Sequence, residues 1–120
     1  MEKYTLGAVE TRFADIIWDN APLTTNELIA LCEKELNWKR TTTYTVLKRL
    51  SDRGIFHKDA KLVNVIIPRD RFYSMQSENY VDRAFNGSLP KFLAAFTSER
   101  RLSREEAEEL KRLIDSLSED

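Results

Sequence analysis

The sequence predicts a mainly α-helical fold with one small β-hairpin. Apolar residues recur at intervals of three and four through most of the chain, which is the spacing of one helix face. Residues 55–67 instead combine β-branched residues with a short polar turn, which is typical of a hairpin. Pro22, Gly54 and Gly87 fall where predicted helices end.

Length and composition favour one small domain, or a small domain with an appendage. The chain has 120 residues, 42% of them hydrophobic, which is enough for a modest core that a partner subunit could extend. One cysteine, Cys32, excludes an internal disulfide and a cysteine-based zinc site, and we expect it to be a small core residue. No long apolar run occurs, and residues Met1–Tyr4 lack the layout of a signal peptide. We therefore expect a cytoplasmic protein without membrane insertion.

The first two helices are predicted from their apolar faces and end signals. Leu6, Val9, Phe13 and Ile17 share one side of a helix that ends before Pro22. The stretch Thr24–Glu27 is a capping box, with Thr24 as N-cap and Glu27 at the third helical position. The second helix carries its apolar residues inward and ends near Leu36.

Residues 38–54 predict a third helix with two chemically different faces. Val46, Leu47 and Leu50 define its buried side, and Gly54 supplies its C-terminal stop. The opposite side carries hydroxyls, a phenol and an ammonium, from Thr41, Tyr44, Thr45 and Lys48. Such a face can hydrogen-bond to base edges in a DNA major groove. Taken alone, an ordinary solvated helix face is the more common explanation, because most amphipathic helices have one.

The hairpin adds a wing to this arrangement. We expect a strand over residues 55–58, a turn over 59–61 and a second strand over 62–67, stopped by Pro68. A helix, a short turn and a polar-faced helix followed by a hairpin indicate a winged helix-turn-helix head. His57, the only histidine, is expected at the rim of the wing, because no catalytic or metal-binding partner accompanies it.

Charge is distributed unevenly along the chain. The net charge is -1, yet residues 38–61 hold seven Lys or Arg against two Asp. A local basic patch on a neutral chain fits a protein that touches DNA with one surface. The expected phosphate contacts come from five cations, namely Lys39, Arg40, Arg49, Lys58 and Lys61.

Residues 69–120 predict three further helices, separate from a DNA-binding domain over residues 1–68. Asn86-Gly87 ends the first, Ser88 caps the second and Ser103 with Glu106 forms a capping box for the third. Their large apolar side chains exceed what the head needs, so we expect them to pair with a second chain. The predicted dimerisation residues are Phe72, Tyr80, Phe85, Leu89, Phe92, Leu93, Phe96, Leu110, Leu113, Ile114 and Leu117.

The chain resembles a family of bacterial winged-helix repressors that includes the penicillinase, methicillin-resistance and copper-responsive repressors. The matching residues run through nearly the whole chain: Glu10, Trp18, Thr25-Asn26-Glu27-Leu28, Trp38, Thr42, Thr45, Arg49-Leu50, Gly54, Phe85-Asn86-Gly87-Ser88-Leu89, Leu102-Ser103-Arg104-Glu105-Glu106 and Leu110. The resemblance implies a homodimeric repressor on a dyad-symmetric operator. It also implies base reading by Thr41, Thr42, Tyr44, Thr45 and Lys48.

Two departures from the family pattern bear on regulation. The copper branch ends in a cluster of metal-binding cysteines, whereas this chain ends in Ser118-Glu119-Asp120, so a metal or other cofactor is not expected. The β-lactam branch is cleaved in its fifth helix within an Asn-Phe pair. The aligned pair here is Ala95-Phe96, which leaves cleavage by a membrane sensor-protease system as one hypothesis for the releasing signal.

Two functions of different classes remain open from the sequence. The leading hypothesis is a DNA-binding transcriptional repressor. The alternative is a protein-interaction adaptor that uses the winged head without DNA, in line with the near-zero net charge and the acidic tail. An enzyme is not expected, because the sequence has no nucleophile–base pair, metal-ligand spacing or Gly-rich phosphate loop.

Overall fold

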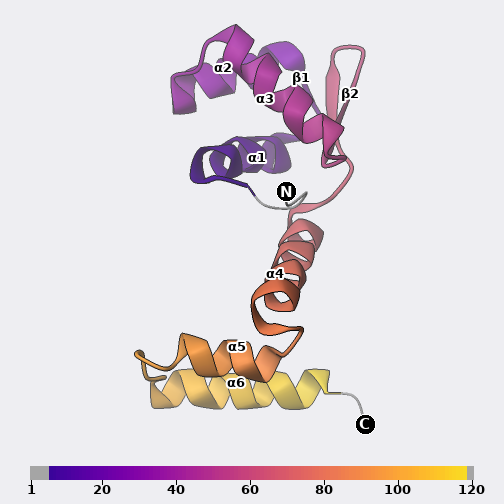
Figure 1. Ribbon diagram of the computed structural model, residues 1–120. Helices are drawn as coiled ribbons and strands as arrows, with labels where there is room; N and C mark the ends of the chain where they lie inside the picture. Colours follow the sequence, from indigo (N-terminus) through magenta and orange to yellow (C-terminus); the bar gives the residue numbers. More distant parts are fainter. Residues whose placement is uncertain (1–5, 119–120) are drawn as a thin grey trace. The chain divides into compact units, whose positions relative to one another are not determined.

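A computed structural model describes residues 6–118, and it shows a winged helix followed by a helical C-terminal region (Figure 1). The predictions about Met1–Tyr4 and about Glu119-Asp120 lie outside the described residues. Two compact units are present, residues 1–79 and 80–120. In chain order, the elements are α1 (Ala8–Asn20), β1 (Leu23–Thr24), α2 (Thr25–Leu36), α3 (Arg40–Asp52), β2 (Phe56–Asp59), β3 (Leu62–Val65), α4 (Arg69–Phe85), α5 (Leu89–Phe96) and α6 (Arg104–Leu117).

The first unit has a continuous core between its helices and its sheet. Phe13 of α1, Leu28 of α2 and Leu50 of α3 are fully buried, together with Phe56 and Val63 of the sheet. Cys32 is buried among them, and burial raises the pKa of its thiol to about 11, although a hydrogen bond with Thr43 opposes the rise. The thiol is therefore protonated at neutral pH, as suits a core residue.

The predicted capping box of α2 is present with both of its hydrogen bonds. Thr24 Oγ1 accepts from the Glu27 amide at 3.1 Å, and Glu27 Oε1 accepts from the Thr24 amide at 2.8 Å. The hydrogen bonds with Thr24 hold the pKa of Glu27 below its usual value. These bonds fix where α2 begins and the angle at which the chain enters it.

The wing includes a strand that the sequence did not reveal. Strand β1 pairs antiparallel with β3, with Leu23 opposite Val63, and the sheet order is β1-β3-β2. Two residues are too few to show the alternation by which strands are predicted. Strand β3 is also shorter than expected, because the amides of Ile66 and Ile67 both donate to the Ile55 carbonyl instead of continuing the ladder.

The start of α4 belongs to the first unit. Arg69 pairs with Asp19 at 2.7 Å and with Asp15 at 3.2 Å, and its guanidinium lies over the Trp18 ring. Phe72 is fully buried, 5.5 Å from the Trp18 ring centre. Phe72 is therefore part of this core and inaccessible to a second chain, so its predicted place on the dimerisation surface requires correction.

The second unit contains the end of α4, with α5 and α6. Ring contacts join Tyr80, Phe85 and Phe92 at centre distances of 5.6–6.1 Å. Ser88 caps α5 as predicted, accepting from the Lys91 amide at 3.2 Å. Ser103 likewise caps α6, but only one half of its capping box is recorded, since the Glu106 carboxylate contacts Arg100 at 3.4 Å.

Candidate nucleic-acid interface

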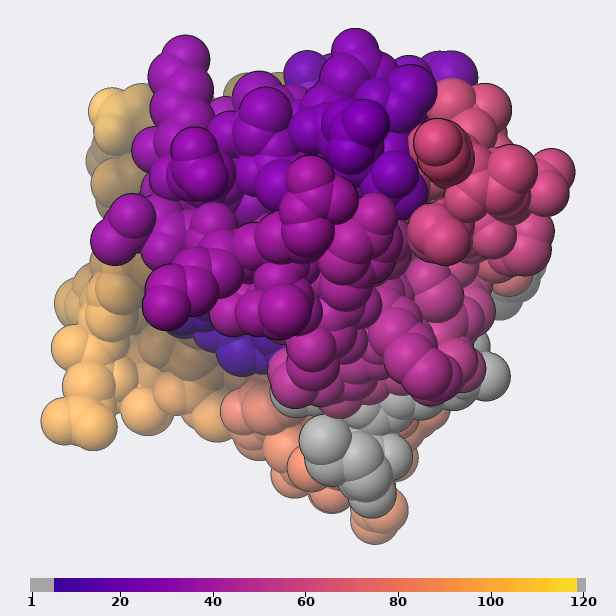
Figure 2. All heavy atoms as spheres, turned by 90° about the horizontal axis from the view of Figure 1, so that it is seen from above, coloured from indigo at the N-terminus to yellow at the C-terminus, as the bar shows by residue number. Residues whose placement is uncertain are grey.

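Helix α3 has a polar, exposed side, and packing of its opposite side against the first unit fixes the position of the helix. Thr43, Val46, Leu47 and Leu50 are buried against the rest of the first unit. All the residues predicted to read bases are consequently exposed, namely Thr41, Thr42, Tyr44, Thr45 and Lys48. Figure 2 shows magenta α3 and the pink wing on one face of the molecule. The first unit thus offers one surface on which a helix and a hairpin could meet the same ligand.

Two side chains on this surface already make local contacts. Thr45 Oγ1 donates to the Thr41 carbonyl at 2.9 Å, which leaves the Thr45 oxygen free to accept and its methyl group free to pack. Lys48 Nζ lies 3.0 Å from Asp52, with side chains 77% and 66% exposed. Such an exposed pair contributes only about 0.3–0.5 kcal/mol. Lys48 can therefore exchange Asp52 for another acceptor at little cost.

Four of the five predicted phosphate contacts are exposed cations at the two ends of this surface. Lys39 and Arg40 lie at the start of α3, where the backbone amides also favour an anion. Lys58 and Lys61 are exposed on the wing, on β2 and in the turn that follows it. The cations therefore flank the hydroxyl-rich part of α3.

Arg49, the fifth predicted phosphate contact, is engaged with α1. Its Nη1 atom lies 2.8 Å from Glu10 Oε2, and Arg53 lies 3.9 Å from the other Glu10 oxygen. Burial raises the pKa of Glu10, but the hydrogen bonds from Arg49 and the Gly7 amide and the charges of Arg53 and Arg49 outweigh it, so the pKa lies below its usual value. Arg49 thus holds α3 against α1, a role that sequence reasoning missed because Glu10 and Arg49 are 39 residues apart.

A cleft of about 360 Å³ separates the second half of α3 from strand β2. Its lining residues are Tyr44, Leu47, Lys48, Ser51, His57 and Lys58. Ser51 and His57 were not among the predicted interface residues. No sequence signal marks Ser51, because its place opposite the wing depends on how the hairpin folds back on α3.

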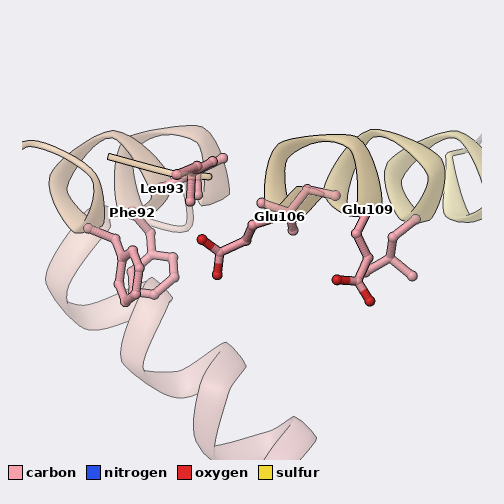
Figure 3. A pocket seen from close by; sticks show the side chains of 8 residues that line it. Phe92, Leu93, Glu106 and Glu109 are labelled. Carbon is pink, nitrogen blue, oxygen red and sulfur yellow. The ribbon is translucent and has the colours of Figure 1, made fainter. Parts of the chain in front are cut away.

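The predicted dimerisation residues of the second unit are largely exposed. Leu89, Phe96, Leu113, Ile114 and Leu117 each expose half or more of their surface, and neither α5 nor α6 has a fully buried residue. A groove between the two helices is lined by Phe92, Leu93, Phe96, Leu102, Glu106, Glu109, Leu110 and Leu113 (Figure 3). This unit therefore leaves uncovered the apolar surface that its helices would normally bury.

The Ala95-Phe96 pair lies in the last turn of α5. The Thr97 amide donates to the Leu93 carbonyl at 3.0 Å, so the backbone around the pair is helical. Arg100 lies 5.1 Å from the centre of the Phe96 ring. A protease that needs an extended substrate would have to unwind this turn first.

Within residues 6–118, no group of three or more His, Cys, Asp or Glu side chains is arranged to hold a metal ion. In the same range, no helix is both long and apolar enough to cross a membrane.

Comparison with known families decides the relationship of the chain. The family described as penicillinase repressor matches residues 6–116, which is nearly all of the sequence. The chain belongs to the penicillinase repressor family. Members of this family are regulators of transcription, and the winged-helix head agrees with that assignment.

Named members of the penicillinase repressor family align along almost their full length. The penicillinase repressor of Bacillus licheniformis is 27% identical over 110 residues, covering 88% of this chain and 86% of that protein. The methicillin resistance regulatory protein MecI of Staphylococcus aureus strain Mu50 is 24% identical over 115 residues, covering 92% and 94%. The MecI protein of Mammaliicoccus sciuri is 23% identical over the same length.

Proposed function

We propose that this chain is a transcriptional repressor that binds a dyad-symmetric operator as a homodimer. The observation that carries the proposal is the exposed side of α3, where Thr41, Tyr44, Thr45 and Lys48 lie between two pairs of exposed cations. Relatives in Bacillus and Staphylococcus that are named as a repressor and a regulatory protein support it. A repressor acts where the chromosome is, so the proposed location is the cytoplasm.

In this proposal α3 enters the major groove and the wing lies beside it. An α-helix with its side chains is about 10–12 Å wide and the major groove is about 12 Å wide, so α3 fills the groove. Lys39, Arg40, Lys58 and Lys61 then meet phosphates on either side and set the register of the head. The hydroxyls of α3 and the Lys48 ammonium read base edges, and threonine methyl groups pack on thymine methyls.

The apolar surface of the second unit supports the homodimer. Leu113, Ile114 and Leu117 expose 51%, 53% and 72% of their surface along α6. Most soluble homo-oligomers are closed assemblies, most often two-fold symmetric dimers, and burying this surface against its copy would form one. Two linked heads gain affinity through effective concentration, by about a hundredfold or more over one head.

Release from DNA would follow from any change that separates the two copies. Cleavage between Ala95 and Phe96 by a sensor-protease system is one such signal, and a ligand that loosens the C-terminal helices is another. Either acts on the second unit and leaves α3 unchanged. Dissociation would then lower the affinity for the operator without altering base preference.

The direct test is binding of the full-length protein to its own upstream DNA across a salt series. Four cations on each of two heads neutralise about eight phosphates, so affinity should fall by roughly three to five powers of ten between about 50 and 200 mM salt. Failure to bind this DNA at low salt, or an affinity independent of salt, would overturn the proposal and favour the protein-interaction adaptor.

A further inference from the structure

The cleft between α3 and β2 has the chemistry of an anion site. Lys48 and Lys58 bring ammonium groups to it, His57 an imidazole and Tyr44 a phenol. None of the lining residues is acidic. Asp52 pairs with Lys48 from the same helix, but both side chains are mostly exposed, so an incoming anion can replace it.

Ser51 supplies a second, independent observation at this cleft. Its Oγ atom is shielded from solvent and has no hydrogen-bond partner among the described residues. Buried hydroxyls are nearly always hydrogen-bonded, because an unsatisfied one costs free energy. The neighbouring threonines show the usual alternative, since Thr43 and Thr45 donate to the carbonyls four residues earlier, those of Lys39 and Thr41. An unpaired Ser51 in the wall of a basic cleft points to a partner outside the chain.

The position of the cleft identifies that partner. Tyr44 and Lys48 belong both to the cleft and to the exposed side of α3. Since α3 fills the width of a major groove, whatever lies along its flank faces the sugar-phosphate backbone. The cleft occupies the flank towards the wing, between α3 and β2.

We propose that this cleft seats one backbone phosphate of the bound duplex in each head. This inference rests on the proposed DNA binding and adds Ser51 and His57 to the phosphate-binding set. Lys58 supplies the charged contact, and Lys48 adds positive charge at the edge of the cleft while its ammonium reads a base edge. Ser51, after a change of its χ1 rotamer, and His57 donate hydrogen bonds to phosphate oxygens. Because α3 and the wing then contact the same DNA strand, this contact fixes the orientation of the head relative to the duplex.

Two substitutions test the phosphate seat, Ser51→Ala and His57→Ala in the full-length protein. Each should lower affinity for the upstream duplex about tenfold, the loss expected for one hydrogen bond to a charged group. The loss should be equal on mixed-sequence DNA at low salt, because phosphate contacts carry no base preference. Ser74→Ala on α4 is the matched control for a serine and should bind like the wild type.

Combining the Ser51→Ala substitution with a modified DNA phosphate, as in a double-mutant cycle, shows whether the lost contact is to a phosphate. Upstream duplexes are prepared with single phosphates replaced by neutral methylphosphonates. For the wild type, one position in each half-site should cost about tenfold, and Ser51→Ala should show little further loss at that position while remaining additive elsewhere. His57→Ala provides the same test at an exposed residue should Ser51→Ala fail to fold.

The outcomes separate this inference from the function on which it rests. Wild-type protein that binds the duplex, with both variants binding within twofold of it, would overturn the phosphate seat and leave the repressor intact. Full additivity at every methylphosphonate would do the same. Wild-type protein that binds no DNA would remove the proposed function together with the seat.

Discussion

Glu10 of α1 and Arg49 of α3 are joined by an ion pair of 2.8 Å across the first unit. Glu10 is 18% exposed and also accepts a hydrogen bond from the Gly7 amide, at the start of its own helix. One carboxylate therefore caps α1 and anchors α3. We infer that the pair sets the orientation of the recognition helix α3, and that the main role of Arg49 is to position this helix and not to bind phosphate.

Glu10→Gln tests this role through the pH dependence of stability. The folded state holds the pKa of Glu10 below its ordinary value of 4.5, so the pair stabilises the fold above that pH and the contribution is lost as pH falls through the lowered pKa. Near neutral pH the variant should lose about 1 kcal/mol, since Arg49 is half exposed. Thermal unfolding from neutral to acidic pH measures the difference, which should shrink as the solution is acidified.

Glu33→Gln, at an exposed position on α2, is the control and should unfold like the wild type. A Glu10→Gln deficit that persists unchanged at low pH would show that the carboxylate charge is not what stabilises the α1–α3 contact.

Lys48 and Lys61 should differ in how their loss affects DNA binding. Lys48→Ala should cost about 1–3 kcal/mol on the preferred operator and flatten the preference at one base position, if its ammonium reads a base. Lys61→Ala should weaken binding equally on all sequences and reduce the salt slope by about one. Binding to a set of single-base operator variants measures both. An unaltered base preference in Lys48→Ala would remove Lys48 from the reading set.

The burial of Phe72 predicts where the head can be cut from the rest of the chain. A fragment of residues 1–79 should fold, remain monomeric and bind the operator weakly, because it keeps the whole core but loses the second unit. A fragment ending at Pro68 lacks Phe72 and Arg69. Loss of a buried phenylalanine costs about 3–5 kcal/mol, so this shorter fragment should unfold far more easily.

Circular dichroism and chemical denaturation of the two fragments compare their stabilities. Phe72→Ala in the full-length chain is the companion variant and should show a similar loss. Equal stability of both fragments would mean that α4 contributes nothing to the head.

A charge placed on the exposed side of α6 should separate the two copies. Leu113→Glu buries an unpaired carboxylate in the proposed interface, which costs several kcal/mol in a dimer and little in a monomer. Sedimentation should show a shift to monomer, with operator affinity reduced by about a hundredfold. Glu108→Lys, a charge change at another exposed position of the same helix, is the comparison. A Leu113→Glu protein that remains dimeric would place the interface elsewhere.

Much of the fold could be predicted because its signals are local. Helix spacing, the box at Thr24 and Glu27, and the serine caps at Ser88 and Ser103 identify where helices begin within a few residues of sequence. The features that were missed depend on distant partners. Strand β1 exists only through its pairing with β3, and Phe72 shows its place only through contact with Trp18.

In the candidate site, too, the features with local sequence signals could be predicted and those that depend on distant residues could not. The exposed side of α3 follows from helical spacing alone, and the structure agrees with it. The engagement of Arg49 and the cleft at Ser51 require knowledge of which elements pack on α3. From the sequence, Arg49 could not be distinguished from a cation that binds phosphate, because both are basic residues in a basic stretch. Only the structure shows that Arg49 pairs with Glu10 and holds α3 against α1.

Recognition of a symmetric site by two copies of the chain is tested by selecting duplexes from a random-sequence pool with the full-length protein, sequencing them and determining the mass of the complex. We predict enrichment of a two-fold symmetric site, with half-sites about one helical turn or a multiple of it apart, bound by two chains. Enrichment of an asymmetric site bound by one chain, or no enrichment at low salt, would contradict it.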